Sequence, residues 1–341
     1  MKNTSLVLFA LITFLACRIS NTTKTTSTAY QITKKIPLIG DGFWDYLTVQ
    51  EATERLFVSH GTQVQVIDLK AGKLLGSIPD TKGVHGIAIA TDLGKGFISC
   101  GNDTSVTVFD LATLAVTGKV KVTGANPDAI LYDPSTKQVF TFNHTGKSAT
   151  AINAVNNKVV ATIPLEGEAE FAVTDGEGTI FVNIEDKSTI AVISAKTLKV
   201  THNWPLASGE EPTGLAFDVK NSRLFAVCGN QKMVVLNSKT GKVVQTLPIG
   251  EGSDGVVFDP GTGRIYSSNG EGNMTVLEEK TPDAYRVIAT VPTQKGARTI
   301  TLDPKTHRLY LPVAEREEPV GDARPKIRPG TFVVLEVTEV K

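Results

Sequence analysis

The sequence repeats itself at intervals of about 40 residues, and this repeat limits the possible folds more than any other feature. Each copy opens with a short apolar run that follows one polar or charged residue. The copies are spaced by 40, 43, 42, 43, 41 and 44 residues. The marker positions are Asp45, His85, Asp128, Glu170, Thr213, Asp254 and Arg298. Units of this length bury their apolar surface against neighbouring units, as in solenoids and propellers.

The unit that spans residues 212–252 shows what each copy contains. It holds four apolar runs of strand length, separated by turn residues: Leu215–Phe217, Leu224–Cys228, Met233–Leu236 and Val243–Leu247. This pattern predicts an antiparallel up-and-down sheet. The two middle runs are apolar at both parities, so both faces of the sheet must be buried. Sheets stacked face to face around an axis achieve this. We therefore predict an all-β, seven-bladed β-propeller with four-stranded antiparallel blades.

The last blade is expected to be closed by an N-terminal strand. Residues 30–40 resemble a fourth strand without its first three, whereas the seventh unit supplies only three strands. Pairing of Ile32–Ile39 with Phe332–Val337 would remove the open edge of the array. Prolines, which are tolerated at sheet edges, place the fourth strand outermost in each blade. They are Pro37, Pro79, Pro164, Pro205, Pro248 and Pro292.

The chain divides into three segments. Residues 1–17 have the pattern of an export signal of the lipoprotein type, in which an apolar run ends at Cys17 as the lipidation site. Phe14 and Leu15 depart from the usual pattern, which leaves simple cleavage or an uncleaved signal as alternatives. Residues 18–29 are a Ser/Thr-rich tether. Residues 30–341 form the propeller of an exported bacterial protein, periplasmic or tethered to the outer membrane.

Charge and cysteine content narrow the class further. The chain has 35 basic and 35 acidic residues, which predicts no nucleic-acid partner and membrane contact only through the N-terminal signal or lipid. No exposed apolar strip is evident, so we expect a monomer. Cys100 and Cys228 occupy equivalent places in the second and fifth units. Because a disulfide needs Cα atoms within about 7 Å, we predict two free, buried thiols.

Several segments resemble a known repeat. The stretches DLKAGKLLGSIP from Asp68, NSKTGKVVQTLPIG from Asn237 and DPGTGRIYSSNG from Asp259 are similar to the YVTN-type β-propeller repeat of YncE-like exported propellers. The similarity covers residues 30–341. It implies a propeller fold, and it implies that the Asp-Pro and Thr-Gly-Lys turns belong to the scaffold.

The marker positions are expected to meet around one end of the central channel. In an up-and-down blade, the start of the first strand and the end of the second strand lie on the same face, where propellers bind ligands. We predict a site there for a small polar ligand, an ion or a partner protein, with shifted carboxylate pKa values. The alternative is a set of solvated polar groups that cap strand ends. The predicted ligand-binding residues are Asp45, His85, Asp128, Glu170, Asp254, Arg298, Asn143, Asn183 and Asn269.

Three of the five histidines belong to this end of the channel. His60, His85 and His144 fall in adjacent units and, together with carboxylates, are candidates for a divalent metal site. No short spacing between histidines supports such a site, so the sequence requires no cofactor. His202 and His307 are expected at the surface without such partners.

Two further features bear on the channel mouth. Trp44 and Tyr46 flank Asp45 and form either an aromatic wall for a flat ligand or a wedge between blades seven and one. An insertion at residues 314–330 is either a lid that brings Arg324, Lys326 or Arg328 over the mouth, or a surface loop.

The sequence favours a binding or interaction protein, because it contains no recognisable nucleophile motif or dinucleotide loop. The alternative is a metal-assisted hydrolase, a lactonase or an oxidoreductase at the same mouth. In that case Asp254 or Asp128 would hold the ion or act as a base, and Arg298 would orient an anionic substrate.

Overall fold

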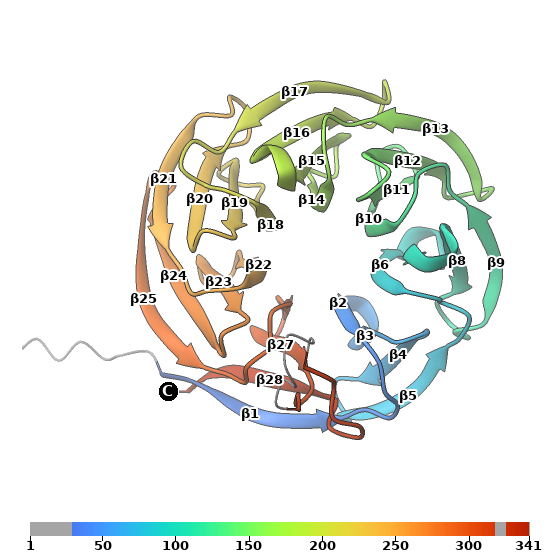
Figure 1. The fold of residues 1–341 in the computed structure, drawn as a ribbon, viewed down its shortest axis with the longest axis horizontal. Coiled ribbons are helices and arrows are strands. Elements are labelled where there is room, and N and C mark those ends of the chain that lie inside the picture. The colour runs from blue at the N-terminus through green and yellow to red at the C-terminus, as the bar shows by residue number, and fades with distance from the viewer. Residues whose placement is uncertain (1–28, 318–324, 341) are drawn as a thin grey trace, which may run out of the picture.

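The computed structural model describes residues 29–317 and 325–340. These residues form seven four-stranded antiparallel sheets arranged in a ring, as predicted (Figure 1). Short 3-10 helices, η1 (Glu51–Thr53), η2 (Thr91–Leu93), η3 (Gly101–Asp103) and η4 (Glu185–Lys187), lie in turns between strands. Within the described part of the chain, no helix is long and apolar enough to cross a membrane.

Blades one to three follow the chain in order. Blade one contains β2 (Trp44–Gln50), β3 (Arg55–His60), β4 (Gln63–Asp68) and β5 (Lys73–Ile78). Blade two contains β6 (Val84–Ala90), β7 (Lys95–Cys100), β8 (Ser105–Asp110) and β9 (Val116–Lys121). Blade three contains β10 (Pro127–Asp133), β11 (Gln138–Asn143), β12 (Ser148–Asn153) and β13 (Lys158–Pro164).

Blades four to six continue the same pattern. Blade four contains β14 (Ala169–Thr174), β15 (Thr179–Ile184), β16 (Thr189–Ser194) and β17 (Lys199–Pro205). Blade five contains β18 (Pro212–Asp218), β19 (Arg223–Cys228), β20 (Lys232–Asn237) and β21 (Val243–Pro248). Blade six contains β22 (Ser253–Asp259), β23 (Arg264–Asn269), β24 (Asn273–Thr281) and β25 (Ala284–Pro292). The first strand of each blade is innermost and the fourth, where the prolines occur, lies at the rim (Figure 1).

Blade seven is built from both ends of the described chain. Its strands are β26 (Thr301–Asp303), β27 (Arg308–Val313), β28 (Val333–Val340) and, at the rim, β1 (Ala29–Pro37). The antiparallel pairing of β1 with β28 runs from Ala29 opposite Val340 to Pro37 opposite Val333. The predicted closure by the N-terminal strand is therefore confirmed. In blade seven, β1 therefore occupies the place that the fourth strand has in the other six blades.

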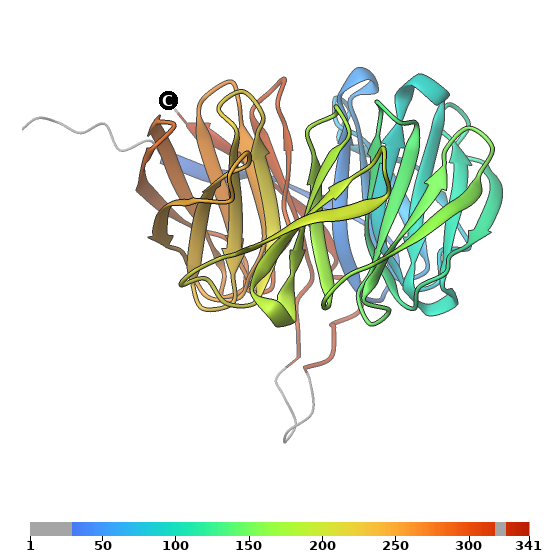
Figure 2. The same ribbon diagram turned by 90° about the horizontal axis from the view of Figure 1, so that it is seen from above.

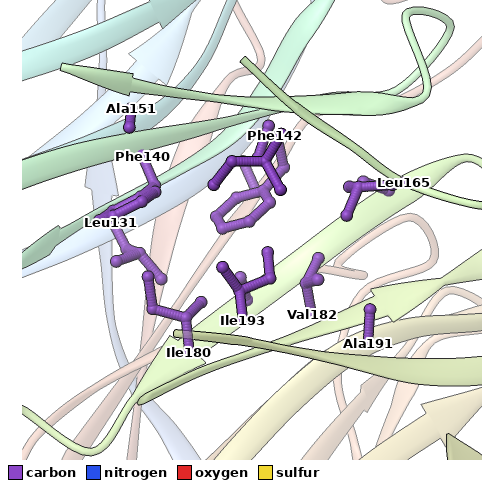
Figure 3. Close-up of a cluster of buried hydrophobic side chains, with 14 of the residues drawn as sticks. Leu131, Phe140, Phe142, Ala151, Leu165, Ile180, Val182, Ala191 and Ile193 are labelled. Carbon is purple, nitrogen blue, oxygen red and sulfur yellow. The ribbon is translucent and has the colours of Figure 1, made fainter. Parts of the chain in front are cut away.

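The core lies between the blades. Between blades three and four, Phe140 and Phe142 of β11 pack against Ile180 and Val182 of β15 (Figure 3). All four side chains are buried, as both faces of the middle strands must be when sheets stack. This packing explains the apolar residues at both parities of the second and third strands.

Trp44 is a wedge between blades one and seven. It is 2% exposed and lies in one cluster with Leu56 of β3 and with Tyr310, Phe332 and Val334 of blade seven. Its ring centroid is 5.4 Å from that of Phe332. Of the two interpretations of Trp44, the structure therefore supports the wedge and removes this residue from the ligand surface.

The Asp-Pro and Thr-Gly turns are held by aspartates that end the first strands. Asp133 accepts hydrogen bonds from the backbone N–H and the hydroxyl of Thr136, at 3.0 and 2.6 Å. Asp259 accepts one from the backbone N–H of Gly261 at 2.9 Å, and its Oδ2 lies 2.8 Å from His307 Nδ1. His307 thus has a carboxylate partner that the sequence did not predict. These contacts satisfy backbone N–H groups of the turns, so the aspartates belong to the scaffold.

Cys100, Cys228 and His202 lie in the surroundings that the sequence predicted. Cys100 and Cys228 are both buried and unpaired. Burial raises the pKa of each thiol, which keeps it in the unreactive protonated form. His202 lies on the outer strand β17, where its ring is 5.9 Å from that of Trp204.

Candidate functional site

A β-bulge at the same place in six blades positions the marker residues. In each first strand, the register with the second strand shifts just after the strand begins. The shift occurs at Asp45, His85, Asp128, Glu170, Thr213 and Asp254. A bulge places an extra residue on one strand and redirects its side chains. In blade one, the Ser59 hydroxyl occupies the gap and accepts a hydrogen bond from the Asp45 backbone N–H at 2.9 Å.

The first group of site residues spans blades one to three. His85 Nδ1 lies 2.7 Å from Asp45 Oδ2 and 3.6 Å from Asp128 Oδ2. The three side chains place one possible ligand atom each within 4.8 Å of one another. Asp128 Oδ1 is buried without a hydrogen-bond partner. Imidazole with two carboxylates is a donor set that binds divalent transition metals.

Arg298 links this group to blade six. Its guanidinium forms an ion pair with Asp254, and a second nitrogen lies 3.9 Å from Asp45 Oδ1. The Arg298 side chain is about one-third exposed, whereas that of Asp45 is almost fully buried. The marker residues of blades one, two, three, six and seven therefore meet around one end of the channel.

A second group lies between blades three and four. His144 Nδ1 is 3.0 Å from Glu170 Oε1, and His144 Nε2 is 3.7 Å from Glu168 Oε2. His144, Glu170 and Glu185 also place one possible ligand atom each within 4.8 Å of one another. Glu185 and Glu168 were not among the predicted site residues. Glu185 directly follows β15, and Glu168 directly precedes β14. These positions next to strand ends were the only feature of the sequence that could have identified them.

Both groups contain more carboxylates than histidines, and the negative charge of the carboxylates raises the pKa of their neighbours. Burial raises the pKa of Asp128. The charge of His85 lowers this pKa, and the charges of Asp45 and Glu170 raise it, so that it is about 8. Burial would lower the pKa of His85, but its hydrogen bond to Asp45 and the charge of Asp128 outweigh burial and raise it to about 9. Burial and the charge of Glu170 raise the pKa of Glu185 to about 7. The mouth therefore retains protons that a bound cation can replace.

His60 does not join the other two histidines. Its side chain is buried, stacks on Phe332 at 3.9 Å between ring centroids, and places Nδ1 3.0 Å from Gln65 Oε1. Burial lowers its pKa. The three histidines that were predicted as metal ligands therefore lie in different surroundings. Only His85 and His144 lie among carboxylates.

The three predicted asparagines are structural. Asn143, Asn183 and Asn269 are fully buried. Asn143 and Asn269 donate to hydroxyl groups of the neighbouring third strand, at 3.0 and 2.9 Å. Asn183 donates to the backbone carbonyls of Thr213 and Gly214 in blade five. These side chains hold strands and blades together, and their role in ligand binding stays a prediction.

An exposed aromatic residue at the mouth is Phe43, which the sequence did not single out. It is 47% exposed. The Arg298 guanidinium lies 5.5 Å from its ring centroid, and the His85 ring lies 6.5 Å from it. Trp44 is buried, so the exposed aromatic side chain at this place is that of Phe43. Its position in the loop before β2 gave no periodic signal.

The described parts of the insertion, residues 314–317 and 325–330, project from one face of the disc (Figure 2). Arg316 and Ile327 form a β-bridge, and the Arg328 guanidinium is 2.6 Å from Glu315. The Arg316 guanidinium lies 5.6 Å from the Trp44 ring centroid. Arg324 lies outside the described residues, and the role of the insertion as a lid stays a prediction.

Comparisons with known proteins support the fold. No family model matches the chain, and no curated protein matches it. Many solved structures match. One of them, titled Kuenenia stuttgartiensis Hydrazine Synthase, has a TM-score of 0.70 at 17% identity, over 80% of this chain and 94% of that one. The chain is thus a seven-bladed β-propeller with a polar group at one end of its channel. Membership of the YVTN-type family stays a prediction.

Proposed function

We propose that this chain is an exported binding protein that takes a small, positively charged polar ligand at the channel mouth. The observation that supports the charge of the ligand is the surplus of carboxylates over cations. Asp45, Asp128, Glu170, Asp254 and Glu185 surround His85, His144 and Arg298, and three of the carboxyl groups have a raised pKa. A bound cation lowers the free energy of these ionised carboxylates.

Phe43 supports the same assignment. An exposed aromatic face beside carboxylates attracts ammonium groups through cation–π contact. The Arg298 guanidinium now occupies a position near this ring. A ligand ammonium group can bind between Phe43 and the carboxylates of blades one to three. Export rests on the pattern of residues 1–17, which lie outside the described residues.

Thermal unfolding with a metabolite panel tests this function. At pH 8 and low salt, small diamines and amino alcohols are expected to raise the melting temperature, whereas matched carboxylic acids are not. A ligand at one hundred times its Kd contributes about 2.7 kcal/mol to the unfolding free energy. Asp128→Asn and Phe43→Ala are expected to weaken this effect at least tenfold in Kd.

A matched control removes one charge from the opposite end of a blade. Glu177→Gln changes an exposed carboxylate in the turn between β14 and β15, far along the strand from Glu170, and is expected to bind the amine like the unaltered chain. Stabilisation by anions, or equal amine binding by the Asp128→Asn and Glu177→Gln variants, would contradict the proposal. Native mass spectrometry of protein from its source then identifies the ligand.

A second candidate function is metal-assisted hydrolysis or oxidation at the same mouth. The two clusters of one histidine with two carboxylates favour it. Elemental analysis of the mature protein is expected to find a divalent metal in stoichiometric amount, and His85→Gln with Asp128→Asn is expected to release it. Metal-free protein that binds amines without turnover would exclude this alternative.

A further inference from the structure

The other end of the channel contains a large apolar cavity. It has a volume of about 750 Å³ and lies against blades one and four to seven. The side chains that line it include Phe171, Val173, Phe217, Val257, Phe258 and Ile300. Its wall also includes Val219, Pro260 and Pro304, which follow the ends of first strands. The polar mouth lies at the starts of these strands, so the cavity opens on the opposite face.

Tyr46 and Phe171 separate the two ends of the channel. They belong to blades one and four, which are not neighbours in the ring, so their contact crosses the channel. The ring centroids are 5.2 Å apart in an edge-to-face arrangement. A hollow between this pair and Asp254 has a volume of about 10 Å³, which holds no more than about one water molecule. The cavity is therefore closed at its inner end and independent of the polar site.

The cavity leaves apolar surface in contact with solvent. Val219 is 54% exposed, and Phe217, Val257 and Phe258 are half-buried. Small-molecule sites have volumes of about 300–1,000 Å³ and mostly apolar, aromatic walls. A neighbouring hollow of about 520 Å³ shares Tyr46, Leu47, Glu51 and Phe171 with the cavity. The closed inner end of the cavity fits a compact molecule better than a peptide strand or a second copy of the chain.

The charged side chains around the cavity indicate which class of ligand it fits. Among the described lining residues, the carboxylates and amines are Glu51, Asp218 and Lys220. Glu51 and Lys220 are exposed at the rim, and they have opposite charges. Asp218 is buried; its Oδ1 accepts a hydrogen bond from the Asn221 backbone N–H at 3.2 Å as a turn cap, whereas its Oδ2 is buried without a hydrogen-bond partner. Apart from the Asp218 carboxylate, the described interior offers phenyl rings and aliphatic groups.

We propose that this cavity binds a neutral, ring-containing apolar small molecule. Phe171, Phe217 and Phe258 provide faces and edges for aromatic contact. The driving force is burial of apolar surface on both sides, at about 25 cal/mol per Å². The proposal concerns a second site, and it stands whether or not the polar mouth binds a cation.

Fluorescence titration of the full chain with N-phenyl-1-naphthylamine tests the proposal. This neutral aromatic probe brightens in apolar surroundings. We expect saturable 1:1 binding with a negative heat-capacity change in calorimetry. Val257→Phe and, as a second variant, Val173→Phe fill the cavity and are expected to weaken binding at least tenfold without altering the circular dichroism.

Two matched variants complete the test. Val160→Phe adds the same side chain at a half-exposed position on the outer strand β13, and Asp128→Asn alters the polar mouth. Both are expected to bind the probe like the unaltered chain. Unchanged binding by both cavity variants, an equal loss in Val160→Phe, or no saturable binding would overturn the proposal. So would a dimer in sedimentation analysis that Val257→Phe separates, because a second copy would then cover the cavity.

Discussion

A chain that begins at Leu38, and so lacks β1, is expected to lose cooperative unfolding and to aggregate. The deletion removes the partner of β28 and exposes its backbone donors and acceptors along the whole edge. Such an edge pairs readily with other chains. The same deletion removes the buried side chains of Tyr30 and Ile36, which reach two neighbouring blades.

The contacts of these two side chains explain the size of the effect. The Tyr30 hydroxyl lies 3.2 Å from that of Tyr266 in blade six, and Ile36 packs in the cluster that joins blades seven and one. Burial of two such side chains contributes roughly 3–6 kcal/mol. A whole domain unfolds at a cost of about 5–15 kcal/mol. The loss of the strand hydrogen bonds adds to this, so little stability is expected to remain.

Circular dichroism and size-exclusion chromatography measure this result. The matched control is a chain that begins at Ala29, which keeps every described contact of β1 and is expected to melt like the longer chain. A monomeric deletion variant with an unchanged melting temperature would show that the N-terminal strand is dispensable. The ring would then be closed by contacts between blades alone.

Stability is expected to fall as the pH rises from 6.5 to 8, which is the second large effect. The Asp128 carboxyl has a pKa of about 8 in the folded chain, above its ordinary value of 3.8. The His85 imidazole has a pKa of about 9, above its ordinary value of 6.5. In this pH range the folded state therefore binds more protons at these two groups than the unfolded state does.

The sign follows from proton linkage. A group whose folded pKa is raised contributes stability below its unfolded pKa and loses it as the pH passes the folded pKa. Each extra proton gives a slope of about 1.4 kcal/mol per pH unit. With both groups partly titrated, these two groups alone are expected to decrease the unfolding free energy by about 3 kcal/mol between pH 6.5 and 8.

Urea unfolding at half-unit pH steps, with a chelator present, measures this slope. Asp128→Asn removes one titrating carboxyl and is expected to flatten the curve by about one proton. Glu177→Gln, on the opposite face of the ring, is expected to keep it. An unfolding free energy that stays constant or rises over this interval would contradict the protonation assigned to the mouth. Ammonium ligands are expected to flatten the same curve because they compete with these protons.

The repeated apolar runs determined the number of blades, the strand order and the closure by β1. These follow from the sequence because each run is local and must bury both faces. The same spacing brought Asp45, His85, Asp128, Asp254 and Arg298 to one end of the channel. Equivalent positions in equivalent units lie side by side once the ring closes.

Only the tertiary structure decided which side chains meet at each end of the channel. The bulges that redirect Asp45 and Tyr46 into the channel depend on register, which no apolar pattern encodes. The contact of Tyr46 with Phe171 joins blades one and four, and His144 meets Glu185 across a blade boundary. Such contacts depend on side-chain directions within the closed ring. For this reason the sequence placed Asn143 at the mouth and passed over Phe43, although the structure buries the first and exposes the second.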